Sequence, residues 1–325
     1  LGLYAAASFL ALVSQSLDGL LVARLLQGVG CAGTRVVAVS VVRDCYSGRR
    51  MSQVMSLVMM IFMAVPIVAP SIGQAILLVA DWHWIFSTLL IAGVVMLLWS
   101  AVRLPETLPV ELRQPLKLRP VLRSYGRVLS NLFSIGYTLA TTAIFGALFS
   151  FISMAQQIYV DIFGLGVWFP VVFAGVAITM ACSSFMNSRL VTVIGMRRLS
   201  HGAILTFIAF GLLQCLMQAG GLQDVALFTI CMAINMACFG FMGGNFNSMS
   251  MEPLGDIAGT ASSVIGFTTT LGGAILGFIV GQQFNGTLWP IAIACAGYGV
   301  LGLAFVLIAE RGKLFQTQHA PKPGN

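Results

Sequence analysis

Apolar residues form long uninterrupted stretches along this chain, and short segments between them hold most of the polar residues. A stretch of about 20 apolar residues crosses the hydrocarbon core of a bilayer, roughly 30 Å thick, as one α-helix. The stretches are continuously apolar rather than alternating, which favours helices over the strands of a membrane barrel. The pattern predicts ten membrane-spanning helices, over residues 1–15, 19–42, 52–79, 84–102, 131–159, 166–188, 200–218, 225–250, 258–281 and 288–309.

The amino-acid composition also indicates an integral membrane protein. Of the 325 residues, 58% are hydrophobic and only 8% are charged, whereas soluble domains are about a quarter charged. The chain has too few charges to cover a soluble protein of this size. The seven cysteines form no CxxC pair and lie almost entirely within apolar stretches. We therefore expect small buried side chains there, and neither disulfides nor a metal site.

The positions of the basic residues predict the topology. Of the 17 Lys and Arg residues, all but Arg24 and Arg35 lie in alternate segments between the predicted helices or in the C-terminal tail. The opposite segments hold four acidic residues and no Lys or Arg, namely Asp18, Asp81, Asp161 and Asp224. Basic loops stay in the cytoplasm, so we expect the C-terminus to be cytoplasmic. The net charge of +7 then reflects topology, and we expect no nucleic-acid partner.

The longest segment between predicted helices, residues 103–130, divides the chain. Residues 1–102 hold four predicted helices and form the remainder of an N-terminal half. Residues 131–309 hold six and form a C-terminal half. We expect 103–130 to be a cytoplasmic central loop and 310–325 a cytoplasmic tail. The first predicted helix begins at Leu1 without an initiator Met, so we expect the chain to be N-terminally truncated.

Arg24 and Arg35 lie inside the predicted helix 19–42, where a charged side chain is costly. They are eleven positions apart, about three helical turns, and share one face with Gln27. A polar face on an apolar helix indicates a water-filled cavity. The alternative is that each arginine extends to the nearer membrane surface. We predict that Arg24, Gln27 and Arg35 act in substrate binding or proton coupling.

Small residues indicate close helix packing. Gly28 and Gly30 belong to a G-x-G-x-x-G pattern, but a dinucleotide site needs that pattern between a strand and a helix. In the middle of a membrane helix, glycines instead let helices approach closely. The same interpretation applies to three glycines at every fourth position of 258–281, namely Gly273, Gly277 and Gly281.

Pro66, Pro70 and Gly73 predict a bent helix over 52–79, which can serve gating. Three further polar residues lie at depth and are candidates for a cavity: Gln156, Asn235 and Asn245. Interhelical hydrogen bonds without a substrate role are the alternative for each of the three.

Residues suited to catalysis are not evident in the sequence. No Asp or Glu lies deep in a predicted helix, and His83, His201 and His319 fall in loops, helix ends or the tail. We find no nucleophile–base pair, metal-ligand cluster or phosphate-binding loop. We therefore expect a protein that is not an enzyme and has no cofactor.

Several segments resemble one transporter family. LLVARLLQGVGCAG resembles the fourth-helix motif R-x-x-Q-G-x-G-x-A of major facilitator drug:proton antiporters, and the matching residues are Arg24, Gln27, Gly28, Gly30 and Ala32. VPIVAPSIGQAIL resembles the fifth-helix motif G-P-x-x-G-G, in which Pro70 and Gly73 match while Ala69 and Gln74 replace glycines. RDCYSGRRMSQVMSLVMM, DWHWIF, LPETLP and AGTASSVIGF further resemble the bicyclomycin/chloramphenicol-resistance (Bcr/CflA-type) branch. NSRLVTVIGMRR, with Gly195 and Arg197, looks like a second-half copy of the family's signature loop.

The resemblance implies an all-α integral membrane bundle of twelve helices, of which this chain holds the third to the twelfth. It also implies a multidrug efflux transporter of the bacterial inner membrane that exports small amphipathic drugs or metabolites by alternating access. Protons would exchange for substrate, and the proton gradient would supply the energy. The family's first-helix acid would lie in the missing helices. We expect a monomer with a small-molecule substrate. A proton-coupled symporter or facilitator on the same fold, or a non-transporting sensor or scaffold, are the alternatives.

Overall fold

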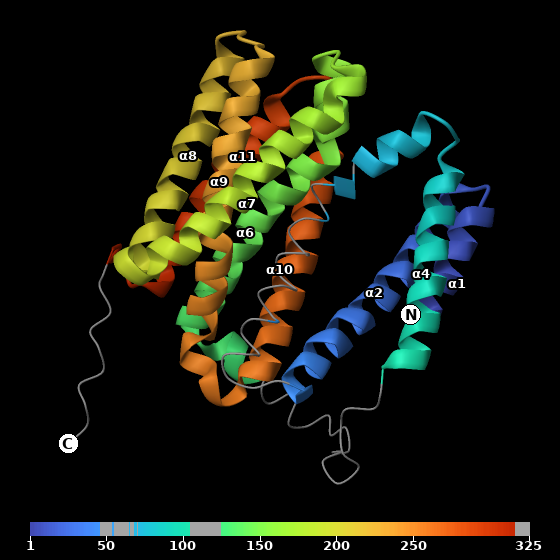
Figure 1. The fold of residues 1–325 in the computed structure, drawn as a ribbon. Coiled ribbons are helices and arrows are strands. Elements are labelled where there is room, and N and C mark those ends of the chain that lie inside the picture. Colours follow the sequence, from blue (N-terminus) through green and yellow to red (C-terminus); the bar gives the residue numbers. More distant parts are fainter. Residues whose placement is uncertain (46–53, 55–64, 66–67, 70, 105–124, 316–325) are drawn as a thin grey trace. The chain divides into compact units, whose positions relative to one another are not determined.

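The computed structural model describes residues 1–45, 54, 65, 68–69, 71–104 and 125–315. Within these ranges the regular elements are all helices (Figure 1). The chain divides into two compact units, Leu1–Leu116 (unit 1) and Lys117–Asn325 (unit 2). The predicted all-helical class is confirmed.

Seven of the described helical segments are long and apolar enough to cross a bilayer: His83–Arg103, Leu132–Ile162, Gly166–Ile194, Met196–Ala219, Val225–Leu254, Ala261–Gly281 and Trp289–Ala309. The predicted number of ten is therefore not established. Helix α1 (Gly2–Val13) has only 12 residues. Helix α2 (Leu17–Cys45) has 29 residues and is not among the seven. Most of the predicted helix 52–79 lies outside the described residues.

In unit 1, helix α1 packs against both α2 and α4 (His83–Arg103). Tyr4 of α1 lies at both contacts. A Cβ added to Gly30 of α2 would lie 2.8 Å from the Tyr4 backbone nitrogen, and one added to Gly93 of α4 would lie 2.8 Å from the Tyr4 ring. Both glycines therefore sit where α1 approaches its neighbours most closely.

Unit 2 is a bundle of six long helices: α6 (Leu132–Gln156), α7 (Phe169–Ile194), α8 (Met196–Ala219), α9 (Val225–Met251), α10 (Ala258–Gly281) and α11 (Trp289–Ala309). Helix α6 contacts α9, α10 and α11, and α9 in turn contacts α7 and α8. A π-helical turn, Gln157–Ile162, extends α6. The large side chains that are fully buried in this core come from several helices and include Tyr137, Phe207 and Phe246.

Three glycines of α10 face α6. A Cβ added to Gly273 would lie 2.6 Å from the Phe145 Cβ, and one added to Gly277 would lie 2.5 Å from the Phe149 Cβ. Gly281 faces Ser153 in the same way, at 3.1 Å. The predicted packing role is confirmed for Gly273 and Gly277, where a larger residue would force α6 and α10 apart, whereas at Gly281 a small shift of the Ser153 side chain would make room.

The connection between α7 and α8 is much tighter than the sequence predicts. Helix α7 continues to Ile194 and α8 begins at Met196, so Gly195 alone separates them. Its φ of +89° is a conformation that only glycine adopts readily. The predicted loop at 189–199 is therefore wrong, and the basic residues there belong to helices.

The end of the predicted central loop also has structure. Residues 125–130 are helical. Val128 is fully buried against a small apolar cluster that includes Leu254, Ala261 and Ile265. This part of segment 103–130 therefore belongs to the packed part of unit 2, whereas residues 105–124 lie outside the described residues.

Candidate functional site

Unit 1 contains a polar chain that we call the Arg24 cluster: Ser8, Arg24, Gln27 and Phe86. The Arg24 guanidinium donates to Gln27 Oε1 at 2.7 Å, and Gln27 Nε2 donates to Ser8 Oγ at 2.8 Å. Ser8 in turn donates to the Tyr4 carbonyl one turn earlier in α1. The guanidinium carbon lies 5.6 Å from the centre of the Phe86 ring of α4, within the range of a cation–π contact. The cluster therefore joins α1, α2 and α4.

Burial within this cluster is uneven. Ser8 and Gln27 are buried, whereas the Arg24 side chain is exposed. Among the residues that the structure describes, no carboxylate lies within ion-pair distance of Arg24. The arrangement fixes the position of a permanent positive charge and leaves that charge without a counterion in the described part of unit 1.

The other residues singled out in the first half are placed as follows. Arg35 belongs to α2, but its side chain lies outside the described residues, as do Pro66 and Pro70. No described atom lies within 4 Å of a Cβ added to Gly28 or Gly73. Gly28 is therefore not at a close helix contact in the described part of the chain, in contrast to Gly30.

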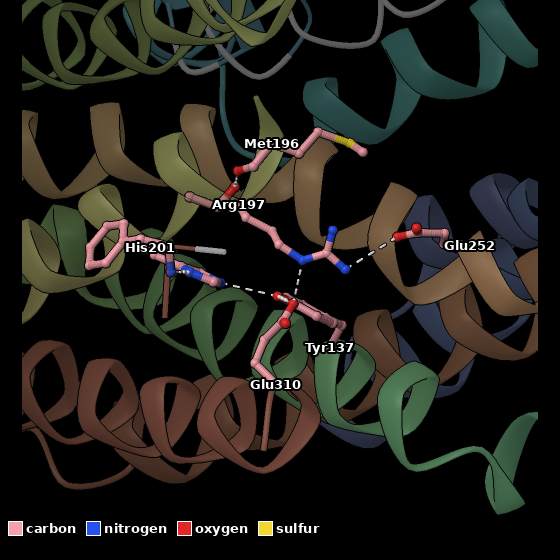
Figure 2. Close-up of polar contacts among 8 residues, drawn as sticks. Tyr137, Met196, Arg197, His201, Glu252 and Glu310 are labelled. Carbon is pink, nitrogen blue, oxygen red and sulfur yellow. Dashed lines mark hydrogen bonds and ion pairs between the residues drawn. The ribbon is translucent and has the colours of Figure 1, made fainter. Parts of the chain in front are cut away.

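Unit 2 contains a second polar group that the sequence does not reveal, the Arg197 cluster (Figure 2): Tyr137, Arg197, His201, Glu252 and Glu310. Arg197 Nε donates to Glu310 Oε1 at 2.7 Å, and an Arg197 terminal nitrogen lies 3.7 Å from Glu252 Oε2. The Tyr137 hydroxyl donates to the same Glu310 oxygen at 2.7 Å and lies 3.1 Å from His201 Nε2. One carboxylate at the end of α11 thus connects α6, α8 and α11.

One prediction that concerns this cluster is wrong. We expected His201 at a helix end, yet it lies within α8 and is fully buried. Glu310 follows α11 directly and its side chain is only 7% exposed. The available signal was the spacing of Arg197 and His201, which places them on one face of a helix once α8 begins at Met196. Their partners lie far away in sequence and could not be predicted.

The three polar candidates of the second half have different environments. Asn245 of α9 and Asn187 of α7 exchange two amide hydrogen bonds, at 3.1 and 2.8 Å. Asn235 is fully buried, with the Cys295 thiol beside it but not within hydrogen-bond geometry. Gln156 is exposed at the end of α6. The sequence left two interpretations for these residues, a place in a cavity or an interhelical hydrogen bond. Of the three, only Asn245 forms an interhelical hydrogen bond within the described residues. No group of three or more metal-ligating side chains occurs in the described ranges.

Comparison with known proteins agrees with this architecture. A model of the Major Facilitator Superfamily matches residues 1–277. The chain is 33% identical over 283 residues to the uncharacterized MFS-type transporter YdgK of Bacillus subtilis, covering 86% of this chain and 70% of YdgK. It is 31% identical over 291 residues to a bicyclomycin resistance protein homolog of Haemophilus influenzae, covering 87% and 72%. It is 29% identical over 295 residues to the multidrug resistance protein MdtL of Escherichia coli O157:H7, covering 88% and 72%.

Two solved structures have the same fold. They are a bacterial homologue of the human lysosomal transporter Spinster in inward-facing unoccupied and occupied conformations, with TM-scores of 0.62 and 0.65 at 15% identity. The matches cover 95% and 98% of this chain and 79% and 82% of the solved chains. The relatives confirm the resemblance to the drug-antiporter branch that the motifs indicate. The chain belongs to the Major Facilitator Superfamily.

Proposed function

We propose that this protein is a multidrug efflux transporter that exports small amphipathic drugs or metabolites in exchange for protons by alternating access. Its helices would correspond to the third to twelfth helices of the family, in a bacterial inner membrane with the C-terminus in the cytoplasm. The names of its relatives support export of drugs. The structural observation that carries the proposal is the Arg24 cluster, because an ordered arginine without a described counterion is rare on an apolar helix.

In this proposal the Arg24 charge acts on a group that reaches it during the cycle. Arginine stays protonated at physiological pH, so Arg24 cannot itself carry the exchanged proton. It would favour the ionised form of a carboxylate brought close to it, or attract an anionic part of the substrate. The hydrogen bonds from Arg24 to Gln27 and from Gln27 to Ser8 hold the guanidinium in one place for that role. Arg35 would supply a second charge on α2.

Helix bending would complete the cycle. Pro66, Pro70 and Gly73 would allow the helix over 52–79 to bend during gating. Gly28 would allow α2 to move, since no described atom lies within 4 Å of a Cβ added there. Gly30 would allow α2 to pack closely against Tyr4 of α1. Gln156, Asn235 and Asn245 remain weaker candidates for contact with substrate.

The test is a fluorescent-drug accumulation assay in cells without their own efflux pumps. We expect Arg24→Ala to abolish export with near-normal membrane abundance. Arg24→Lys should retain little activity, because a point charge does not reproduce the guanidinium fork. Arg103→Ala, which removes an exposed arginine in the last turn of α4, is the matched control and should export normally.

Three outcomes would contradict the proposal. Export by Arg24→Ala at the parental rate would show that the arginine merely extends to the membrane surface. Parental export that continues at full rate after addition of a protonophore would exclude proton antiport. Uptake in place of export would favour a symporter or facilitator on the same fold.

A further inference from the structure

The chain beyond α11 folds back onto the end of unit 2. The amide of Gly312 donates to the Leu307 carbonyl at 2.8 Å, and the amide of Lys313 donates to the Glu310 carbonyl at 3.1 Å. Arg311 and Phe315 have φ values of 52° and 62°, a left-handed conformation that non-glycine residues adopt only when other contacts hold them there. Phe315 has one such contact, with a side chain of α8.

Phe315 is held by His201. Its backbone amide donates to His201 Nδ1 at 3.1 Å, and its ring stands edge-on to the imidazole with 5.7 Å between the ring centres. A backbone amide can only donate, so Nδ1 must be the unprotonated nitrogen of the ring. His201 is itself fully buried, whereas Phe315 is 42% exposed.

The rest of the cluster determines the position of every other proton around His201 (Figure 2). With Nδ1 unprotonated, Nε2 of the neutral ring carries the hydrogen and donates to the Tyr137 oxygen at 3.1 Å. The Tyr137 hydroxyl then donates its own hydrogen to Glu310 at 2.7 Å, and Arg197 donates to the same carboxylate oxygen. A directed chain of hydrogen bonds therefore runs from the Phe315 amide through His201 and Tyr137 to Glu310.

A second proton on the imidazole has only one place to bind. Nε2 already carries a hydrogen, so the added proton must go to Nδ1, where it would face the hydrogen of the Phe315 amide. Two charged groups act on the ring, Arg197 one turn earlier in the same helix α8 and Glu310 after α11. Tyr137 of α6 faces it directly, and Glu252 acts through Arg197. Binding of the proton and binding of the Phe315 amide are thus mutually exclusive.

We propose that Nδ1 of His201 is a proton-binding site that competes with the Phe315 amide, so that proton uptake releases segment 311–315 from the end of unit 2, while Glu310 stays bound to Arg197 and Tyr137. The released segment would also lose the contact that holds Phe315 in its left-handed conformation. This inference does not depend on drug export. It assigns to the protein a response of its C-terminal segment to the proton concentration on that side of the membrane.

Hydrogen exchange of the Phe315 amide tests the proposal. The purified chain in detergent is followed at about pH 5 and pH 8, the interval over which histidines titrate, by mass spectrometry with electron-transfer fragmentation. The matched variant is His201→Asn, because the asparagine side-chain oxygen can occupy the place of Nδ1 and accept the same amide without titrating. The ratio of exchange rates between parent and variant removes the intrinsic effect of pH on exchange.

At pH 8 we expect equal protection in the parent and in His201→Asn. At pH 5 the parent should lose protection about two- to tenfold, the effect of losing one hydrogen bond, while the variant keeps it. His201→Ala, which has no acceptor, should lack protection at both pH values. Equal protection of parent and His201→Asn at pH 5 would overturn the proposal.

Folding and transport are controlled separately. Size-exclusion profile and helical circular dichroism establish that each variant is folded. Protection that survives in a folded His201→Ala variant would show that His201 does not hold the segment, which also overturns the proposal. If His201→Ala does not fold, the comparison of the parent with His201→Asn still decides the outcome. Because the assay measures an amide and not transport, its failure is independent of any failure of the export assay.

Discussion

Arg24 in unit 1 and Arg197 in unit 2 make hydrogen bonds of equal length to chemically different partners. Each donates to a side-chain oxygen at 2.7 Å. The partner of Arg24 is the neutral amide of Gln27, three residues along the same helix. The partner of Arg197 is the carboxylate of Glu310, on a different element, with a second carboxylate at 3.7 Å. The positive charge is therefore compensated in unit 2 and uncompensated in the described part of unit 1.

The comparison separates a structural arginine from one available for function. Removing either partner of a compensated charge that connects helices destabilises the bundle, because the other partner is left unpaired at low dielectric. An ordered charge whose only partner is neutral adds little to stability. Because no counterion neutralises it, it can still interact electrostatically with a ligand or a titrating group. Breaking the arginine's contacts is therefore expected to reduce stability at Arg197 and to reduce transport at Arg24.

The largest expected effect on stability is at Glu310. We expect Glu310→Ala to lower the free energy of unfolding of unit 2 by about 3 kcal/mol, because Arg197 and the Tyr137 hydroxyl both lose their shared acceptor. The matched change in unit 1, Gln27→Ala, should lower stability by only about 1 kcal/mol, since it removes ordinary hydrogen bonds. Thermal unfolding in detergent, followed by circular dichroism, measures both. Equal losses at the two positions would remove the distinction between the two clusters.

A second, smaller effect is expected where unit 2 is most tightly packed. Gly277→Ala places a methyl group against the Phe149 Cβ of α6 and should cost about 1–3 kcal/mol through overpacking. Gly28→Ala in α2 adds the same methyl group where no described atom lies within 4 Å. It should raise stability by up to about 1 kcal/mol, because alanine favours the helix. The same thermal unfolding measurement applies to both variants.

A drug-export measurement on Gly28→Ala then shows whether Gly28 is needed for motion or for packing. If the folded Gly28→Ala variant exports drug poorly, the glycine serves motion rather than packing. A clear loss of stability in this variant would instead show that α2 has a close neighbour at Gly28, and that the two glycines have the same role.

Local features of the sequence predicted much of the helical architecture. Continuous apolar stretches located most of the described helices, and the spacing of four residues between Gly273, Gly277 and Gly281 predicted a close helix contact without indicating α6 as the partner. These predictions succeeded because they depend on residues within one helix. The shared helical face of Arg24 and Gln27 succeeded for the same reason.

Features that join distant parts of the chain could not be predicted. Arg197 and Glu310 are 113 positions apart, and no pattern in one sequence indicates which acid meets which base. The tight turn at Gly195 depends on a single backbone angle, so the helical position of His201 was also missed. Its contact with Phe315 involves a backbone amide, which every residue except proline carries and which no side-chain pattern reveals.

The smallest expected effect concerns Asn187 and Asn245, an uncharged pair in unit 2 that can be compared with the neutral partner of Arg24. Their two amide bonds join α7 to α9, and Asn245 also donates to the Phe241 carbonyl of its own helix. Asn245→Leu should lower stability by about 1 kcal/mol, because interhelical polar contacts in membrane proteins average about 0.6 kcal/mol and Asn187 becomes unpaired.

Replacing both asparagines by leucine should lower stability by less than the sum of the two single changes. Each single change leaves one buried amide side chain without its partner, whereas the double change removes both amides. A double-mutant cycle from thermal unfolding measures this difference. Strictly additive losses would mean that the two amides do not stabilise each other. Export by the folded double variant then separates the remaining roles, because an asparagine that only joins helices can be replaced together with its partner without loss of transport.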